Sequence, residues 1–282
     1  MLGLAFGSFL NVCLSRWPEG ESVVKPRSRC RACGRTLTWW ENVPVVSWLA
    51  LRGRCRTCGT WIGVRYVVVE LAVGALWAIA TWRFIHIAID PDLATADIYR
   101  AATFWIGKLL LALLLIGLAF LDAEHFWLPD IITLPGIFLG CLFALAEGYF
   151  QSNSPMNDIG RGKPLNTAIG LTIGIALSAG LVLLIRWLYW LIRRKEGLGI
   201  GDAKLMAVLA VWLGLPGALL AFFIGVVIGA VMAVTMLLMP KRDETAWGAH
   251  KLPLGTFLCV GGIVSSLWGQ PIIDAYLRLA GF

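Results

Sequence analysis

The sequence has few charged residues for its length. Lys, Arg, Asp and Glu make up 15% of its 282 residues, whereas hydrophobic residues make up 59%. A soluble globular domain has a larger charged fraction, so this composition excludes that class. Tryptophan is abundant, with 14 residues, and its side chain favours the membrane–water interface. The composition therefore predicts an all-α polytopic membrane protein.

Other expected patterns are missing as well. The apolar segment Met1–Leu14 lacks the basic start and the convincing cleavage site of a typical signal peptide. The net charge of +7 is not accompanied by a recognisable nucleic-acid-binding fold. Instead, the basic residues cluster between apolar runs, which is typical of cytoplasmic loops of membrane proteins. We therefore expect membrane lipids, and no nucleic acid, as partners.

The apolar runs predict about eight transmembrane helices. A helix needs about 20 apolar residues to span a bilayer, so the first and sixth runs are short, and the sixth ends at a Pro-Gly turn signal. The runs are Met1–Leu14, Tyr66–Ile89, Ala101–Leu121, Ile131–Phe150, Leu165–Ile192, Ala203–Leu213, Pro216–Met239 and Leu252–Leu267.

A polar block separates the first run from the others. Residues 16–65 carry ten Lys and Arg side chains and are the one plausible extramembrane domain. We therefore expect three parts. Residues 1–15 form a first transmembrane helix that falls short of a full span, 16–65 form a small cytoplasmic domain inserted after it, and 66–282 form the main transmembrane domain.

The distribution of basic residues predicts an orientation. If the block 16–65 is cytoplasmic, the loops Arg193–Asp202 and Pro240–Lys251 lie on the same side, and both are basic. Both termini then lie outside. This orientation also brings two acidic residues, Asp122 and Asp202, to the cytoplasmic boundary of the membrane.

Four cysteines in the polar block have the spacing of a metal site. Cys30 and Cys33 form one C-x2-C pair, and Cys55 and Cys58 form a second after 21 residues. Two such knuckles supply four thiolates to a tetrahedral zinc ion, whose role is then structural because no ligand position stays open. The alternatives are two disulfides or four ordinary thiols, and a cytoplasmic location disfavours disulfides.

Two carboxylates stand at the ends of apolar runs. Asp202 follows Gly199-Ile200-Gly201 and could cap a helix, as could Asp130. Asp122 instead closes a helical run, where the helix dipole disfavours an anion. Charges at such places are costly unless they are paired or functional. These considerations favour Asp122 with Asp202 as a reactive pair, but spacing alone leaves Asp130, Glu124 and His125 open.

Taken together, these motifs resemble the bacterial type IV prepilin peptidases, a family of bifunctional leader peptidases and N-methyltransferases. The matching stretches run nearly from end to end of the chain. They are Gly7–Val12, the two Cys-x-x-Cys pairs, Trp40–Leu49, Arg65–Glu70, Leu121-Asp122, Leu128-Pro129-Asp130 and Gly199–Leu205. One departure is Pro253-Leu254-Gly255-Thr256-Phe257, where the family usually has Pro-Phe-Gly-Pro-Phe.

The resemblance implies an activity and its residues. Asp122 and Asp202 would be the catalytic aspartates, and Cys30, Cys33, Cys55 and Cys58 would lie in the region associated with methyl transfer. The substrates would be prepilins and pseudopilins, cleaved after a Gly at the cytoplasmic face of the bacterial inner membrane. The new N-terminal residue would then be methylated from S-adenosylmethionine. The residues that bind this donor cannot be read from the sequence, because no Gly-rich dinucleotide-type signature is present.

Three other functions are compatible with parts of the pattern. A proton-coupled transporter would need acids in the middle of the apolar runs, which hold almost none. A non-enzymatic membrane adaptor would use the knuckles and would not need the two aspartates. An enzyme that cleaves without methylating would keep both aspartates and release an unmodified amine.

Overall fold

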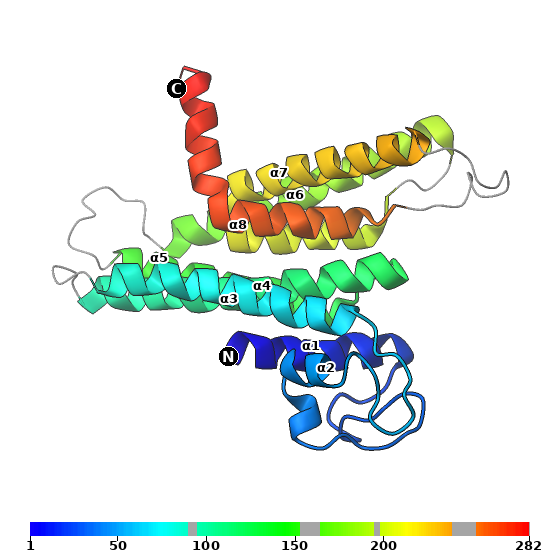
Figure 1. Ribbon diagram of the computed structural model, residues 1–282. Coiled ribbons are helices and arrows are strands. Elements are labelled where there is room, and N and C mark those ends of the chain that lie inside the picture. The colour runs from blue at the N-terminus through cyan, green and yellow to red at the C-terminus, as the bar shows by residue number, and fades with distance from the viewer. Residues whose placement is uncertain (90–94, 153–163, 195–197, 239–251, 282) are drawn as a thin grey trace. The chain divides into compact units, whose positions relative to one another are not determined.

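The computed structural model describes residues 1–89, 95–152, 164–194, 198–238 and 252–281, and these residues are almost entirely helical (Figure 1). Within them, pairing of extended chain is limited to two isolated β-bridges. The elements are α1 (Leu2–Arg16), the 3-10 helices η1 (Trp17–Glu19) and η2 (Trp40–Asn42), α2 (Val46–Ala50), α3 (Arg65–Ala88), α4 (Thr95–His125), α5 (Asp130–Ser152), α6 (Pro164–Arg193), α7 (Ile200–Leu238) and α8 (Leu254–Leu279). The predicted all-α class is confirmed.

Six of the described helices, α3 to α8, are long and apolar enough to cross a membrane. The protein is therefore a multi-pass membrane protein, but the predicted count of eight is not confirmed. One reason is α1, which has 15 residues and is shorter than a full span. The other is α7, a continuous element of 39 residues that contains both the sixth and the seventh apolar run.

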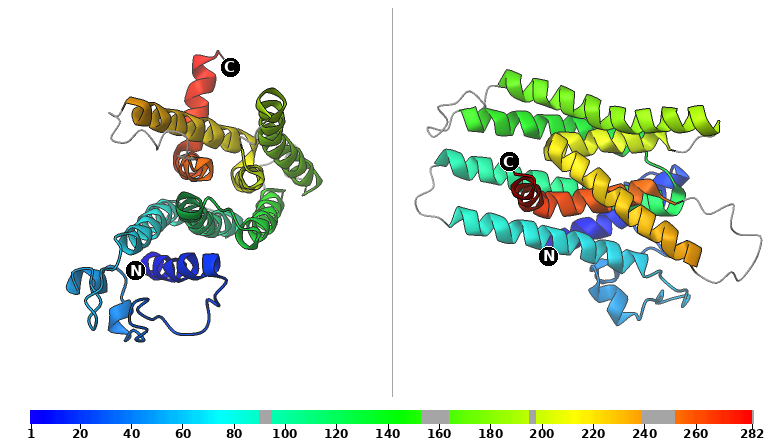
Figure 2. Two further views of the ribbon diagram at one scale, coloured as in Figure 1. Left: turned by 90° about the vertical axis from the view of Figure 1, so that its right-hand side faces the viewer. Right: turned by 90° about the horizontal axis from the view of Figure 1, so that it is seen from above.

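The helix α7 changes direction between those two runs. Gly214 has φ 72° and ψ 170°, a conformation that no helical residue adopts, and Pro216 follows it. Figure 2 shows the yellow and orange parts of α7 running in different directions. The turn signal in the sequence was thus correct, although the chain resumes its helix at once instead of forming a loop.

Parts of the predicted cytoplasmic loops lie outside the described residues. These are the whole of Pro240–Lys251 and residues 195–197 of the loop Arg193–Asp202. The orientation of the chain in the membrane stays a prediction for that reason.

The chain forms two compact units. The first comprises Met1–Pro91 with Lys108–Gly117, and the second comprises Asp92–Gly107 with Leu118–Phe282. In the first unit, α1 packs closely on α3 through small residues. A Cβ atom added to Gly7 would lie 2.7 Å from the Cα atom of Glu70, and one added to Gly3 would lie 2.9 Å from the Trp77 side chain. These glycines let the two helix backbones approach, as small residues do in membranes.

The N-terminal half of α7 is the buried centre of the second unit. Leu205, Met206 and Leu209 are completely buried there, and α5, α6 and α8 pack around α7. The indole N–H of Trp212 donates to the carbonyl of Gly136 at 2.9 Å. Many large apolar side chains on the outer helix faces are exposed, among them Phe138, Trp187 and Phe223. A lipid environment suits these faces.

Candidate functional site

The four cysteines of the polar block converge on one point in the first unit. Their Sγ atoms all lie within 4.8 Å of one another, and those of Cys30 and Cys58 are 3.7 Å apart. With a Zn–S bond of about 2.3 Å, the sulfur atoms of a tetrahedral site are about 3.8 Å apart. All four residues are free thiols and not disulfides. The geometry and the donor set therefore fit a zinc ion.

The two knuckles are built alike. In the first knuckle, the N–H of Cys30 donates to the carbonyl of Arg35, and the N–H of Gly34 donates to the carbonyl of Cys30. In the second, the N–H of Cys55 donates to the carbonyl of Thr60, and the N–H of Gly59 donates to the carbonyl of Cys55. All four donor–acceptor distances are 2.9 Å. Gly34 and Gly59 have φ values of 70° and 68°. Glycine adopts this left-handed conformation without strain, and the turn brings the two sulfurs of each pair to the same side.

The second knuckle also favours the thiolate form that zinc binds. The Thr60 hydroxyl lies 3.3 Å from the Sγ atom of Cys58. Hydrogen bonding with the side chain and the backbone of Thr60 lowers the pKa of the Cys58 thiol to about 6. A thiolate is thus accessible at neutral pH.

Two glutamates that the sequence reasoning overlooked hold this region together. Glu41, whose side chain is 1% exposed, pairs with Arg35 and accepts from the backbone N–H and the hydroxyl of Thr38 at 2.8 and 2.7 Å. Glu70 of α3 accepts from the N–H of Val45 at 2.7 Å. Both lie in stretches that carried the family resemblance. Their burial, which the sequence does not reveal, is the signal that identifies them.

Asp122 is buried near the C-terminal end of α4, in the second unit. It is 6% exposed. Its Oδ2 atom accepts from the backbone N–H of Thr256 at 2.6 Å and from the Thr256 hydroxyl at 3.1 Å. A Cβ atom on Gly255 would lie 2.9 Å from both Cγ and Oδ2 of Asp122. The glycine therefore leaves the space that the carboxyl group occupies at the start of α8.

Asp202 is buried in the first turn of α7. It is 8% exposed, and its Oδ2 atom accepts from the backbone N–H of Gly199 at 3.1 Å. Because α7 begins at Ile200, Asp202 is its third residue. The bond therefore reaches back to the N–H of the residue before the helix, as in a capping box, and Asp202 is not the N-cap residue that the sequence suggested as an alternative. The bond occupies one carboxylate oxygen and leaves the other with unused acceptor capacity.

Leu128 connects the surroundings of the two aspartates. Its Cδ1 atom would lie 3.1 Å from a Cβ on Gly201, beside Asp202, and 3.1 Å from a Cβ on Gly255, beside Asp122. Both aspartates are buried in this unit, as is Cys259 of α8, which is completely buried. Residues far apart in the sequence thus meet within one compact unit, in low-dielectric surroundings that strengthen their interaction.

The competing acids have different surroundings. Asp130 is exposed and pairs with Lys204 of α7 at 2.5 Å, so its charge is compensated at the helix start. Glu124 and His125 are exposed, and their side chains lie 3.9 Å apart. Of the acids that spacing left open, Asp122 and Asp202 are therefore the two that are buried.

Comparison with known proteins identifies the family of this chain. The bacterial peptidase A24 N-terminal domain matches residues 1–84, and the type IV leader peptidase family matches residues 109–234. A Pseudomonas aeruginosa protein named prepilin leader peptidase/N-methyltransferase is 34% identical over the whole chain and 93% of its own length. The chain belongs to the type IV leader peptidase family.

Other members of the family give the same result. A protein of the same name from Stutzerimonas stutzeri is 32% identical over 99% of this chain and 93% of its own. One from Myxococcus xanthus is 37% identical over 86% of this chain and 63% of its own. No solved structure matches the chain. The N-terminal match contains the four cysteines, and the leader peptidase match contains both buried aspartates.

Proposed function

We propose that this protein removes the leader from type IV prepilins and pseudopilins and methylates the amine that the cleavage exposes. The observation that carries the peptidase assignment is the meeting of Asp122 and Asp202 around Leu128. The names of the full-length relatives support both reactions. Asp122 and Asp202 are the proposed catalytic residues.

The two carboxyl groups provide what aspartic hydrolysis requires. Two carboxylates in close contact hold one proton between them, because like charges resist joint ionisation. The ionised member takes a proton from water as its oxygen attacks the carbonyl carbon of the leader glycine. The protonated member donates to the carbonyl oxygen and helps to protonate the departing nitrogen as the C–N bond breaks. The products are a leader carboxylate and a new amine.

The position of the aspartates suits a substrate that lies partly in the membrane. Asp202 stands in the first turn of one apolar helix and Asp122 in the last two turns of another. An apolar substrate helix can lie beside these helices in the bilayer while its basic leader stays in water. We place both aspartates and the knuckle region on the cytoplasmic side of the bacterial inner membrane.

The methylation half of the proposal requires a donor and an ordered knuckle region. S-adenosylmethionine supplies a methyl group whose bond to sulfur breaks with the electron pair on sulfur, while the amine nitrogen gains the methyl and releases a proton. Cys30, Cys33, Cys55 and Cys58 would hold a zinc ion with four thiolates. Such a closed site orders the chain and takes no part in chemistry.

Co-expression with a prepilin tests the assignment. Asp122→Asn and Asp202→Asn should each lower the rate of leader removal by at least about a thousandfold. Mass spectrometry of the substrate follows leader loss and the added methyl group together. Asp130→Asn, which alters an exposed acid, is the control and should cleave at close to the wild-type rate. Retained cleavage in both single variants would refute the catalytic pair.

The same experiment separates the rival functions. A transporter or an adaptor leaves the prepilin uncut in every sample, including the wild type. An enzyme that cleaves without methylating gives a mature substrate with an unmodified amine. The match to named peptidases over the full chain does not favour a transporter or an adaptor.

A further inference from the structure

The first unit contains a cavity of about 740 Å³. Its walls come from α1, the two knuckles, the segment around α2 and the start of α3. Pockets that bind small molecules and cofactors typically measure about 300–1,000 Å³. The cavity is therefore large enough for a ligand of that class. It belongs to the knuckle region, and neither aspartate is among its lining residues.

One face of α1 lines this cavity with polar atoms. Ser8, Asn11 and Ser15 all border it, and their spacing of three and four residues puts them on one face of the helix. The rest of α1 is almost wholly apolar. In apolar surroundings, polar side chains on one helix face cost free energy unless they bind a partner.

Asn11 has an acceptor that no group in the described chain satisfies. Its Nδ2 atom donates to the carbonyl of Tyr66 at 2.8 Å, and this contact fixes which way the amide points because a carbonyl accepts only. The residue is 1% exposed, and its Oδ1 atom has no hydrogen-bond partner among the described residues. A buried acceptor without a donor is costly. Asn11 borders the cavity, and a ligand bound there with an N–H group would supply that donor.

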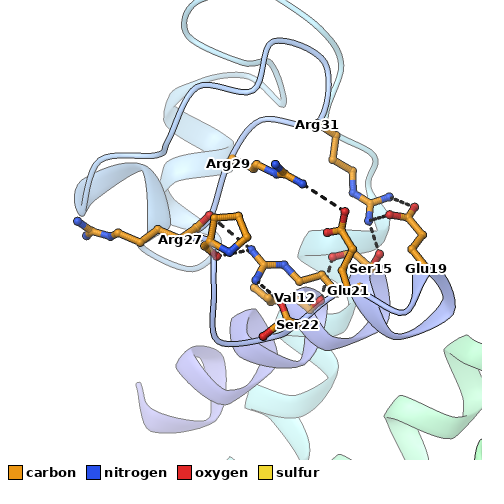
Figure 3. Close-up of polar contacts among 10 residues, drawn as sticks. Val12, Ser15, Glu19, Glu21, Ser22, Arg27, Arg29 and Arg31 are labelled. Carbon is orange, nitrogen blue, oxygen red and sulfur yellow. Dashed lines mark hydrogen bonds and ion pairs between the residues drawn. The ribbon is translucent and has the colours of Figure 1, made fainter.

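Arg16 is a buried cation at the same wall. It is 6% exposed, and it donates to the carbonyls of Ser22 and Pro26, each at 2.8 Å. Within the part of the chain that the structure describes, no carboxylate pairs with it. The arginines nearer the surface differ, because Arg29 pairs with Glu21 and Arg31 with Glu19 (Figure 3). The uncompensated charge of Arg16 suits an anionic group of a ligand.

Aromatic side chains form another part of the cavity wall. Trp48 and Trp61 lie edge to face with ring centroids 5.7 Å apart, and both border the cavity together with Tyr66. Aromatic faces stack on flat heterocycles and attract cations. The lining thus combines an acceptor, a buried cation and aromatic rings.

We propose that this cavity is the binding site for S-adenosylmethionine. Its amino-acid carboxylate matches Arg16, its N–H groups match the Oδ1 atom of Asn11, and its adenine ring and sulfonium match the aromatic wall. This inference rests on the proposed methyltransferase function. It assigns donor binding to α1 and the start of α3 as well as to the knuckles.

Calorimetry on the full chain in lipid nanodiscs tests the site, with S-adenosylhomocysteine as the probe. Gly63 borders the cavity, and a Cβ atom there would meet nothing within 4 Å, so Gly63→Phe can fill the space without a clash. Asn11→Ala removes the unpaired acceptor. Gly180→Phe on α6 is the matched control, since its Cβ also meets nothing within 4 Å.

The wild type and Gly180→Phe should bind the probe equally. Gly63→Phe should abolish binding, and Asn11→Ala should weaken it about tenfold. Methyl transfer to a cleaved prepilin should fall in parallel, while zinc content and leader cleavage report that the variants are folded. Wild-type affinity in a folded Gly63→Phe protein overturns the proposal. If the wild type cleaves but neither binds the probe nor methylates, the proposed methyltransferase function itself fails.

If a variant does not fold, photo-crosslinking of the wild-type protein tests whether the cavity binds S-adenosylmethionine. Ultraviolet irradiation with methyl-labelled S-adenosylmethionine should label peptides from α1 or from residues 48–66. Label confined to peptides of α5 to α8 would overturn the assignment, because none of those helices borders the cavity.

Discussion

The knuckle region and the aspartate region build their sites in opposite ways. The four cysteines come from two short loops, and local backbone bonds shape each pair. The two aspartates come from the ends of separate long helices, and a glycine or threonine contact positions each carboxyl group. The first site offers four thiols, and we expect an ion bound by them to hold the loops together. The second depends on the packing of α4, α7 and α8.

This difference predicts how each site should respond to a substitution. A metal-held loop region has little apolar core of its own, so loss of the ion should unfold it outright. A site between packed helices loses its geometry by degrees, because the helices persist when one contact is removed. The four substitutions below test this contrast, in order of decreasing effect.

Loss of one zinc ligand should have the largest effect. Cys55→Ser should remove the metal, expose residues 16–65 to protease and abolish methylation, because binding energy at such a site is folding energy. The measurements are metal content and limited proteolysis. Cys141→Ser on α5 is the control and should change neither, since Cys141 lies outside the cluster. Full zinc content in Cys55→Ser would contradict the four-cysteine site.

A methyl group at Gly255 should disturb the aspartate site next most strongly. In Gly255→Ala the new Cβ would lie 2.9 Å from the Asp122 carboxyl carbon, which forces that group to shift. We expect leader cleavage to fall about tenfold to a hundredfold, since small displacements of catalytic groups are costly. Gly170→Ala, whose Cβ would meet nothing within 4 Å, should cleave normally. Equal rates in the two variants would show that Gly255 needs no such space.

Removal of one hydroxyl should have a smaller effect. Thr256→Val keeps the backbone N–H bond to Asp122 and loses the hydroxyl contact at 3.1 Å. We expect cleavage to fall by about tenfold or less, measured as kcat/KM on a prepilin peptide. Thr256→Ser retains the hydroxyl and should recover most of the rate. If the serine variant is as slow as the valine variant, the threonine acts through packing instead.

Neutralising Glu41 should have the smallest effect. Bonds from the Thr38 N–H and hydroxyl and from Arg35 lower the pKa of Glu41 from 4.5 to about 2. The carboxylate therefore stabilises the fold above about pH 4.5, and this contribution disappears as the pH falls towards 2. Glu41→Gln should reduce the protease resistance of residues 16–65 equally at about pH 6 and about pH 8. If the loss of protease resistance grows between these two pH values, a group other than Glu41 is responsible for it.

The knuckle region was the more predictable of the two sites. Cysteine spacing indicated the cluster, and the structure brings the four sulfur atoms within 4.8 Å of one another. Glu41 and Glu70 could not be identified in this way, because the sequence around a glutamate does not show whether its side chain is buried or which groups it contacts. Asn11 was overlooked for the same reason.

The aspartate site was only partly predictable. The helix-end argument favoured Asp122, spacing alone left Asp130 and Glu124 open, and it was the family resemblance that implied Asp122 with Asp202. The structure adds that these two are buried, whereas Asp130 and Glu124 are exposed. The count of helices also depended on the fold. The Pro-Gly signal did not show whether the sixth and seventh apolar runs would be joined by a loop or, as in α7, by a bend at one glycine.

The sequence by itself determined the membrane class and the four-cysteine cluster, since hydropathy and cysteine spacing are properties of short stretches of chain. Only the tertiary structure decided which acids meet around Leu128 and which polar atoms line the cavity beside α1. Those outcomes depend on how α4, α7 and α8 pack, and on how closely α1 approaches α3 through glycine. Such contacts join residues distant in the chain, and no local pattern encodes them.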